Sequence, residues 1–426
     1  MKLKDAILKK ISIKLIFCLL LTGVTISYII SAYTSMAKEK YSVDLPELQL
    51  SEKDVTTRLN KLITYSIGNK NQDNTPISPP ELSAAKSIVT DINAGRILYE
   101  KNAYSKAPMA STTKIMTFIV SVENCEDIYE TVTVSQAAAY TEGSTMHLAE
   151  GETITVHDLL YGLMLNSGND AAVALAEHIG GSVEDFCNMM NDRASEIGAS
   201  NTQFKTPHGL DRENHYTTAY DLALIAKEAY KQPLFRKIIA TSSIYLNGHN
   251  LKNTNPLLGK YSEVTGGKTG YTSGAGRCIV FFIETDGIQA VVVLLNCPSS
   301  NNRISDGRKL IKYISQNFRT FKVFERGMRI DYFSVEKGRS DDVYGIIDKD
   351  IYITLANWEK ADITASYHRE TNQLTAPVKY SDKLGSIYIN WGSEMIVDVT
   401  AEHSVVRKTY TDHLGDMIKS LPYVFD

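Results

Sequence analysis

The sequence is poor in residues that cross-link a fold or bind metal. It has five cysteines in 426 residues, without the dense and even spacing of a disulfide scaffold. Its nine histidines are scattered, and the zinc-peptidase pattern His-Glu-x-x-His is absent. We therefore expect no metal and no cofactor, and we expect small, buried thiols at Cys125, Cys187, Cys278 and Cys297.

The chain also lacks an excess of charge of either sign. Charged residues make up 22% and apolar residues 43% of the sequence, and the formal net charge is −4. No basic stripe interleaved with aromatic residues is present, so we expect no nucleic-acid partner. The composition is that of a globular protein. A chain of 426 residues is longer than one hydrophobic core usually supports, which predicts two domains.

One long apolar run stands near the N-terminus. Residues 1–14 are basic, residues 15–30 are apolar, and the small residues Ser35 and Ala37 follow. This order of segments is typical of a secretory signal peptide that is cleaved after Ala37. An apolar run of this length can also serve as a single membrane anchor. Either interpretation predicts export, to the outer face of the cytoplasmic membrane or to the cell wall.

Ser111 is the strongest candidate nucleophile. The sequence has no Gly-x-Ser-x-Gly elbow, so a Ser-His-Asp hydrolase is not indicated, and His208 is interpreted as a loop or packing residue. Residues 109–117 instead predict the start of a buried helix on which Ser111 and Lys114 share a face, so that the lysine amine can take the serine proton. In the first turn of a helix, the Ser111 backbone N–H can also stabilise a carbonyl oxygen that turns negative.

A Ser-x-x-Lys spacing alone is weak evidence, because it recurs elsewhere in the sequence. Ser111 differs because Ser167-Gly168-Asn169 and Lys268-Thr269-Gly270 follow, in the order and roles known from penicillin-binding proteins and serine β-lactamases. With these three motifs the chain resembles the serine-type D-alanyl-D-alanine carboxypeptidases, the low-molecular-mass penicillin-binding proteins. The resemblance extends over nearly everything after Ser83.

The resemblance implies an α+β fold: a penicillin-binding, β-lactamase-like catalytic domain with an antiparallel sheet flanked by helices, followed by a small all-β domain. It implies removal of the terminal D-alanine from peptidoglycan stem peptides ending in D-Ala-D-Ala through a serine acyl-enzyme. It also implies β-lactam antibiotics as covalent inhibitors. A serine β-lactamase and a non-catalytic exported wall-binding protein are the alternatives.

The resemblance further implies three catalytic residues. Ser111 is the nucleophile, Lys114 is its base, and Ser167 relays a proton towards the leaving group. A lysine serves as a base only if its amine is neutral near neutral pH, and both burial and a neighbouring ammonium favour the neutral form. Lys268 is the candidate for that neighbouring ammonium.

The remaining implied residues bind the substrate. Asn169 forms hydrogen bonds with other residues of the site and with the substrate. Lys268 and Thr269 face the terminal carboxylate of the substrate, and Gly270 leaves room for the substrate backbone. The backbone N–H of Tyr271 joins that of Ser111 in the oxyanion hole. Arg303 resembles an arginine that helps to hold the carboxylate, and its alternative interpretation is a surface charge at a helix start.

Periodicity predicts the elements around these motifs. A hairpin is expected at residues 87–91 and 97–99, and neighbouring antiparallel strands are expected at 278–284 and 289–296. Helices are expected at 158–165, 170–179, 219–231 and 303–318. Beyond Thr320, short alternating runs predict an all-β module.

Changes in composition and in the pattern of apolar residues predict five segments. We expect a signal or anchor over residues 1–37, a linker over 38–82, the catalytic domain over 83–320, the β domain over 321–408 and a short amphipathic tail over 409–426. The tail has one apolar helical side, but its acidic excess opposes attraction to an anionic membrane surface. Contact of the tail with a membrane surface therefore stays open.

Overall fold

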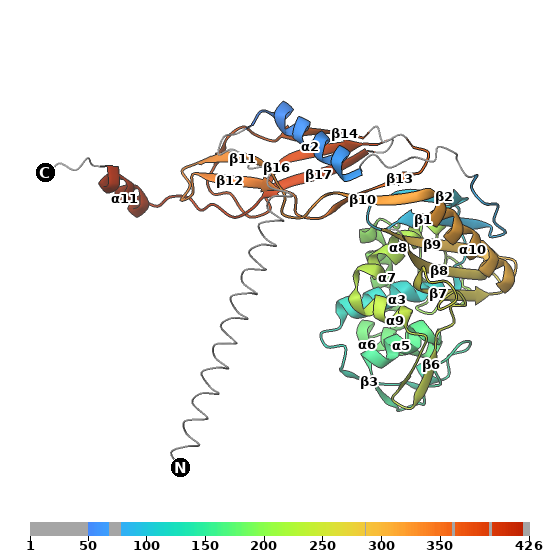
Figure 1. Ribbon diagram of the computed structural model, residues 1–426. Helices are drawn as coiled ribbons and strands as arrows, with labels where there is room; N and C mark the ends of the chain where they lie inside the picture. The colour runs from blue at the N-terminus through green and yellow to red at the C-terminus, as the bar shows by residue number, and fades with distance from the viewer. Residues whose placement is uncertain (1–49, 68–77, 286, 360–362, 392–393, 421–426) are drawn as a thin grey trace, which may run out of the picture. The chain divides into compact units, whose positions relative to one another are not determined.

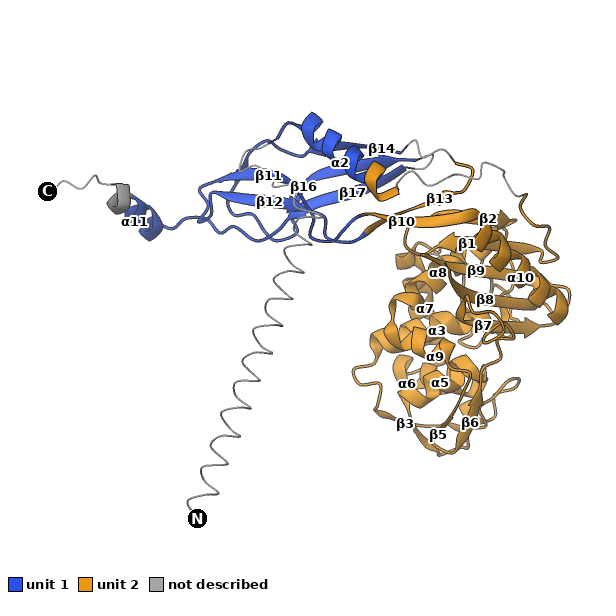
Figure 2. Ribbon diagram, in the orientation of Figure 1, with its two compact units in different colours: residues 1–63, 324–350, 363–426 blue, residues 64–323, 351–362 orange. Residues whose placement is uncertain are grey.

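The computed structural model describes residues 50–67, 78–285, 287–359, 363–391 and 394–420. They form two compact units, which Figure 2 colours separately. The mixed unit contains the described parts of residues 64–323 and 351–362, and the β unit contains those of residues 1–63, 324–350 and 363–426. Residues 1–37, where the sequence predicts a signal or anchor, lie outside the described residues. Within the described ranges, no helix is long and apolar enough to cross a membrane.

A five-stranded antiparallel sheet forms the centre of the mixed unit (Figure 1). Its order is β2-β1-β9-β8-β7, and its strands are β1 Lys86–Asp91, β2 Ile97–Lys101, β7 Val264–Thr272, β8 Gly276–Thr285 and β9 Ile288–Cys297. β8 and β9 are almost continuously buried, because both faces of the sheet are covered. The structure confirms the predicted hairpin and both later strands, and it adds β7, which carries the Lys-Thr-Gly motif.

Helices cover the two faces of this sheet. On one face, α10 (Ser300–Asn317) packs Leu310 and Ile314 against alternate residues of β8 and β9. A larger cluster on the other face includes α3 (Lys114–Asn124) and α8 (Ala219–Lys231). Other elements of the mixed unit are α4 Gln136–Ala139, α5 Val156–Leu165, α6 Asn169–Gly180, α7 Val183–Ile197, α9 Pro233–Ala240, the hairpin of β3 Thr131–Thr133 with β4 Thr153–Thr155, and the hairpin of β5 Ser243–Leu246 with β6 His249–Lys252. The four predicted helices are confirmed, with small shifts at their ends.

α3 is the buried helix at the middle of the mixed unit. Every residue from Lys114 to Ser121 is buried, since the helix is packed by α5, α6, α7 and α8. Ser111 precedes this helix and lies in a 3₁₀ turn, Ala110–Thr113. The expected first α-helical turn at Ser111 is therefore a tighter turn, which continues directly into α3.

A six-stranded sheet forms the centre of the β unit, in the order β14-β16-β17-β12-β11-β15. The strands are β11 Arg329–Glu336, β12 Asp342–Ile346, β14 Thr364–Arg369, β15 Leu374–Thr375, β16 Lys383–Asn390 and β17 Glu394–Ala401. Together with the mixed unit, this sheet confirms the predicted fold class. A separate pair, β10 Phe318–Phe324 and β13 Ile351–Ala356, belongs to the mixed unit except for Phe324, so β10 runs across the expected boundary at Thr320. The tail contains α11, Tyr410–Ser420.

The structure corrects the linker prediction for part of residues 38–82. Glu52–Ile67 form α2, whose apolar residues Val55, Leu59 and Ile63 recur every fourth position and are buried. Asn60 forms two hydrogen bonds with the edge strand β14. Its side-chain amide donates to the Ala365 O and accepts from the Ala365 N–H, each at 2.8 Å. The helix thus covers an edge that would otherwise expose unpaired backbone groups.

Three of the four cysteines expected to be small buried residues are buried, namely Cys187, Cys278 and Cys297. Cys125 differs, because it is only partly buried and its Sγ donates to the Glu130 carboxylate. Burial raises the pKa of the Cys187 and Cys278 thiols to about 11. These thiols therefore stay protonated near neutral pH.

Candidate active site

Ser111 and Lys114 lie within hydrogen-bond reach of one another. The Lys114 Nζ is 3.1 Å from the Ser111 Oγ. Lys114 is fully buried, whereas Ser111 is partly exposed. The join between the 3₁₀ turn and α3 thus brings a hydroxyl open to substrate into contact with an amine shielded from water.

Lys114 has two further hydrogen-bond partners. Its Nζ is 2.6 Å from the Asn169 Oδ1 and 2.8 Å from the backbone oxygen of His208. Burial, and secondly the charge of Lys268, lower the pKa of Lys114 well below its ordinary value. A neutral amine has two N–H donors and one lone pair, so the two carbonyl oxygens take the donors and the lone pair faces the Ser111 hydroxyl. The arrangement suits a neutral general base.

A loop over residues 142–148 orients Asn169, the first residue of α6. The Asn169 Nδ2 donates to the backbone oxygen of Glu142 at 2.6 Å. The buried Asp170 carboxylate accepts hydrogen bonds from backbone N–H groups of the same loop. These contacts fix the amide, so that its oxygen faces Lys114.

Lys268 and Ser167 form the second half of the cluster. The Lys268 Nζ donates to the Ser167 Oγ at 2.8 Å and to the backbone oxygen of Thr269 at 2.9 Å. Burial, followed by the charge of Arg303, lowers the pKa of Lys268 to about 7. Ser167 lies between α5 and α6 at a φ of 60°, a left-handed conformation that is uncommon outside glycine. Such strained residues concentrate at functional sites.

β7 passes very close to the Ser111 turn at Gly270. A Cβ added there would lie 2.9 Å from the Ser111 backbone nitrogen and 3.1 Å from the Met109 oxygen, so a larger residue would push the strand away. β7 is also an edge strand of the five-stranded sheet. An extended peptide can pair with such an edge and bring its backbone to Ser111.

Thr269, Tyr271 and Arg303 lie at the rim of the cluster. The Thr269 Oγ1 is 2.7 Å from the Oγ1 of Thr254. Tyr271 is 55% exposed, whereas Arg303 is only 8% exposed, which overturns the surface-charge interpretation of Arg303. The Arg303 Nη1 donates to the backbone oxygen of Cys278 at 3.2 Å, and burial lowers the pKa of its guanidinium. Direct contacts or charge interactions thus connect Ser111, Lys114, Ser167, Asn169, Lys268, Thr269 and Arg303.

Two histidines that support the site are uncharged near neutral pH. Burial lowers the pKa of His208 to about 3, and its Nδ1 accepts from the Leu210 N–H at 3.2 Å. Burial also lowers the pKa of His215 to about 4, and its Nε2 lies 2.9 Å from the Thr113 Oγ1. The sequence suggested packing for His208 but did not indicate that its backbone oxygen holds Lys114, because a backbone acceptor leaves no residue-type signal.

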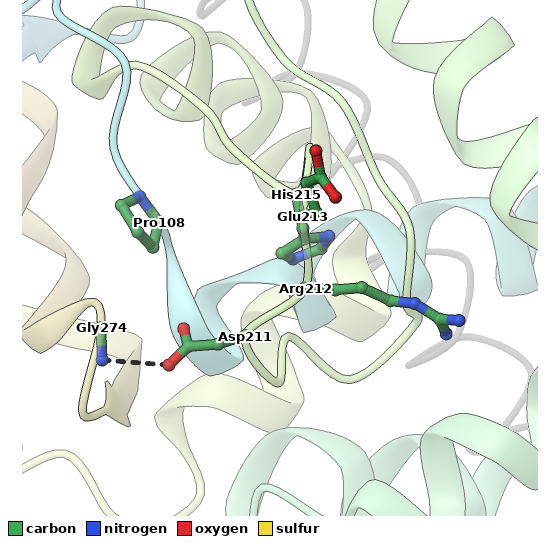
Figure 3. A pocket seen from close by; sticks show the side chains of 6 residues that line it. All are labelled: Pro108, Asp211, Arg212, Glu213, His215 and Gly274. Carbon is green, nitrogen blue, oxygen red and sulfur yellow. Dashed lines mark hydrogen bonds between the residues drawn. The ribbon is translucent and has the colours of Figure 1, made fainter.

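The mixed unit contains a hollow (Figure 3). It is lined by Pro108, Asp211, Arg212, Glu213, His215 and Gly274. The Asp211 carboxylate accepts from the Gly274 N–H at 3.0 Å and from the Thr272 hydroxyl at 2.7 Å, which ties its loop to the turn between β7 and β8. None of the residues predicted from the motifs lines the hollow. Among the described residues, no group of three or more His, Cys, Asp or Glu side chains is placed to hold a metal ion.

The fold and the site together define a class of protein. An antiparallel sheet between helical layers carries Ser-x-x-Lys at a helix start, Ser-x-Asn on a loop and Lys-Thr-Gly on an edge strand, which is the arrangement of penicillin-recognising serine enzymes. In agreement, residues 73–299 match the D-alanyl-D-alanine carboxypeptidase family, and residues 318–407 match the C-terminal domain of penicillin-binding protein 5. The chain belongs to the D-alanyl-D-alanine carboxypeptidases, a family of serine-type peptidases.

Individual relatives cover most of the chain. The D-alanyl-D-alanine carboxypeptidase DacF of Bacillus subtilis is 31% identical over 336 residues, which are 77% of this chain and 86% of that protein. DacD of Escherichia coli is 32% identical over 330 residues, 74% of this chain and 85% of that protein. The crystal structure of penicillin-binding protein 5 from Haemophilus influenzae superposes with a TM-score of 0.68 at 31% identity, and covers 78% of this chain and 100% of that one. The family resemblance is confirmed, and the β-lactamase and non-catalytic alternatives are not favoured.

Proposed function

We propose that this enzyme removes the terminal D-alanine from peptidoglycan stem peptides that end in D-Ala-D-Ala. One observation carries the proposal. The buried Lys114 amine lies 3.1 Å from the Ser111 Oγ, and its three hydrogen-bond partners are all uncharged. A lysine that is shielded from water and faces only neutral partners is suited to take a proton.

Acylation follows from these positions. The Lys114 lone pair accepts the Ser111 proton while the Oγ attacks the carbonyl carbon of the penultimate D-alanine. The carbonyl oxygen becomes negative and accepts hydrogen bonds from the backbone N–H groups of Ser111 and Tyr271. Gly270 lets β7 lie close to the Ser111 turn. A residue with a Cβ at this position would not fit, because the Cβ would lie 2.9 Å from the Ser111 nitrogen.

The leaving D-alanine needs a proton on its amine. The Ser167 hydroxyl, 2.8 Å from the Lys268 Nζ, is the proposed relay. Water then attacks the acyl-enzyme, the Ser111 Oγ leaves with a proton, and the shortened peptide is released. An amine in place of water would give a transpeptidase, which is the activity named for a relative that is 33% identical to this chain, the Streptomyces K15 DD-transpeptidase.

Two buried cations are proposed to bind the substrate's terminal carboxylate. They are Lys268 and Arg303, and the charge of Arg303 contributes to the lowered pKa of Lys268. A bound carboxylate would compensate this positive charge in a region of low polarity. Thr269 is proposed to add a hydroxyl donor.

Release of D-alanine tests the proposal. The parent protein is expected to release D-alanine from diacetyl-L-lysyl-D-Ala-D-Ala, whereas Ser111→Ala is expected to release none above background. Fast turnover of penicillin with no release of D-alanine would support the β-lactamase alternative instead. An unmodified peptide after incubation with folded parent protein would contradict the proposed activity.

We further propose that the enzyme acts outside the cytoplasm. Its proposed substrate is a wall polymer, and residues 1–37 have the composition of an export signal or anchor. Detection of the chain in the membrane or wall fraction of its cell, with the N-terminus of the exported form sequenced, separates cleavage after Ala37 from retention as an anchor. Recovery of the full chain in the cytoplasm alone would contradict export.

A further inference from the structure

Arg277, in β8, has its guanidinium stacked on the ring of Tyr271, in β7. The Arg277 Cζ lies 3.7 Å from the ring centroid, and the two residues are paired directly across the strands. Arg277 is partly buried. Among the residues that the structure describes, none accepts a hydrogen bond from the Arg277 guanidinium or forms an ion pair with it. Stacking uses the face of the guanidinium, so the N–H donors in its plane stay available.

Arg303 is a second guanidinium with unused donors in the same region. It is 8% exposed, its Nη1 donates to the backbone oxygen of Cys278, and its buried Nε has no hydrogen-bond partner within the described part of the chain. Cys278 directly follows Arg277, and the charge of Arg277 is one of the causes that lower the pKa of Arg303. A buried donor without a hydrogen-bond partner destabilises the protein, so an acceptor supplied by a ligand would stabilise the buried Arg303 guanidinium.

The strand register brings both guanidinium groups to the proposed substrate site. Thr269 and Tyr271 are two residues apart in β7, so their side chains leave the sheet on the same face. Arg277 shares that face as the cross-strand partner of Tyr271, and Arg303, in the first turn of α10, donates to the backbone oxygen of the adjoining Cys278. Arg277 thus shares a sheet face with the threonine that is proposed to face the substrate's terminal carboxylate, Arg303 bonds the next residue of β8, and no described carboxylate pairs with either arginine.

We propose that Arg277 is a specificity-determining residue that, held by Tyr271 and next to Arg303, binds the free carboxylate at the C-terminus of the substrate. This inference rests on the proposed function, because it names a further contact in that same site. Arginine suits the role, since it stays charged and can bind a carboxylate through two parallel N–H groups. The residue would favour a peptide with a free end over one whose end is blocked.

A pair of thioesters that differ only in this charge tests the inference. N-benzoyl-D-alanyl-thioglycolate carries the carboxylate, its methyl ester does not, and the thioester bond is reactive enough for both to be followed. The measured quantity is the ratio of kcat/KM for the acid to kcat/KM for the ester. Arg277→Gln is expected to lower this ratio about tenfold, the low end for a charged hydrogen bond at a partly exposed site. Arg277→Lys keeps the charge without the fork and is expected to fall between the parent and Arg277→Gln.

The controls separate binding from structure. Lys61→Gln removes the same charge from an exposed position in the β unit and is expected to leave the ratio unchanged. Equal losses on acid and ester in both Arg277 variants, or an unchanged ratio, would overturn the inference while leaving the proposed function standing. A parent protein that turns over neither thioester and is not acylated by penicillin would overturn the proposed function, and the inference with it.

Discussion

The two units differ in how they treat particular buried charges: in the β unit Arg369 is paired with Asp331, whereas no carboxylate among the described residues bonds the buried Lys114 or Lys268 of the mixed unit. In the β unit, Arg369 and Asp331 are 8% and 1% exposed, and the Arg369 Nη2 donates to Asp331 at 2.9 Å. Tyr367 donates to the same carboxylate at 2.9 Å. Asp331 raises the pKa of Arg369. In the mixed unit, burial instead lowers the pKa of Lys114 and Lys268.

The difference distinguishes a structural charge from a functional one. A buried ion pair with all its hydrogen bonds made keeps its charges and holds the fold. A buried lysine without a carboxylate partner loses proton affinity, which destabilises its charged form but prepares it for proton transfer or for an anionic ligand. The Arg369–Asp331 pair therefore stabilises the β unit, whereas the amines of Lys114 and Lys268 are available for the proposed chemistry.

Lys114→Arg is expected to give the largest effect. A guanidinium keeps the positive charge and the donors but does not deprotonate in proteins. Acylation by penicillin and by peptide should fall by about two to four orders of magnitude, the usual contribution of a positioned acid or base. Stopped-flow acylation measures this, with the melting temperature of the same sample as control, since a larger side chain can also overpack the site. A folded variant that acylates near the parent rate would show that charge alone suffices.

Arg369→Met is the matching disruption of the neutralised pair. It removes the cation that hydrogen-bonds to the buried Asp331 carboxylate, which should lower the free energy of unfolding of the β unit by about 3 to 5 kcal/mol. Arg329→Met is the control, because Arg329 pairs with Glu402 at the surface with 49% of its side chain exposed and should cost less than about 1 kcal/mol. Denaturant titration reports both. Equal, small losses would remove the contrast between the units.

The pH dependence of kcat/KM sharpens the contrast, because it reports the ionisations of the free enzyme. Lys268 has a pKa of about 7, so its charge, proposed to attract the substrate carboxylate, is lost as the pH rises through that value. The acid-to-ester preference should therefore decline above about pH 7. Arg303 helps to lower this pKa, so Arg303→Gln should move the decline to higher pH. If the acid-to-ester preference of Arg303→Gln declined at the same pH as in the parent, or at a lower pH, the charge of Arg303 would not be a cause of the lowered Lys268 pKa.

Lys268→Met should have a small and stabilising effect on the free energy of unfolding. The folded pKa of about 7 lies below the ordinary 10.5, so between these values the unfolded chain binds more protons and parent stability rises with pH. Methionine avoids burying the charged form, so the variant should gain about 1 kcal/mol near and below pH 7, and the gain should shrink towards pH 10. Melting curves across this range measure it. A variant less stable than the parent at pH 6 would show that Lys268 supports the fold.

The elements that position the site could be predicted where their signal is local. The helix expected at 219–231 is α8, and its start has a local cause, because the Thr218 side chain accepts from the Asp221 N–H as a capping residue does. The long apolar runs of β8 and β9 indicated their strands. The three motifs indicated the residues that converge around Ser111.

The parts that were not predicted depend on distant partners. α2 has a mostly polar sequence, and only its packing in the β unit and the Asn60 contacts to β14 make its few apolar residues sufficient for a helix. The backbone oxygen of His208 holds Lys114 from 94 positions away in sequence. The stack of Arg277 on Tyr271 follows from the register of β7 with β8, which the amino-acid pattern alone did not specify.

The central claim, that Ser111 forms the acyl-enzyme with Lys114 as its base, is tested most directly by labelling the full chain with a tagged penicillin. The β-lactam carbonyl takes the place of the scissile amide, so attack by the nucleophile leaves a stable adduct. Peptide mapping by mass spectrometry is expected to find the label on Ser111, and Ser111→Ala is expected to remain unlabelled. A label on another serine, or no label on protein that is demonstrably folded, would contradict the claim.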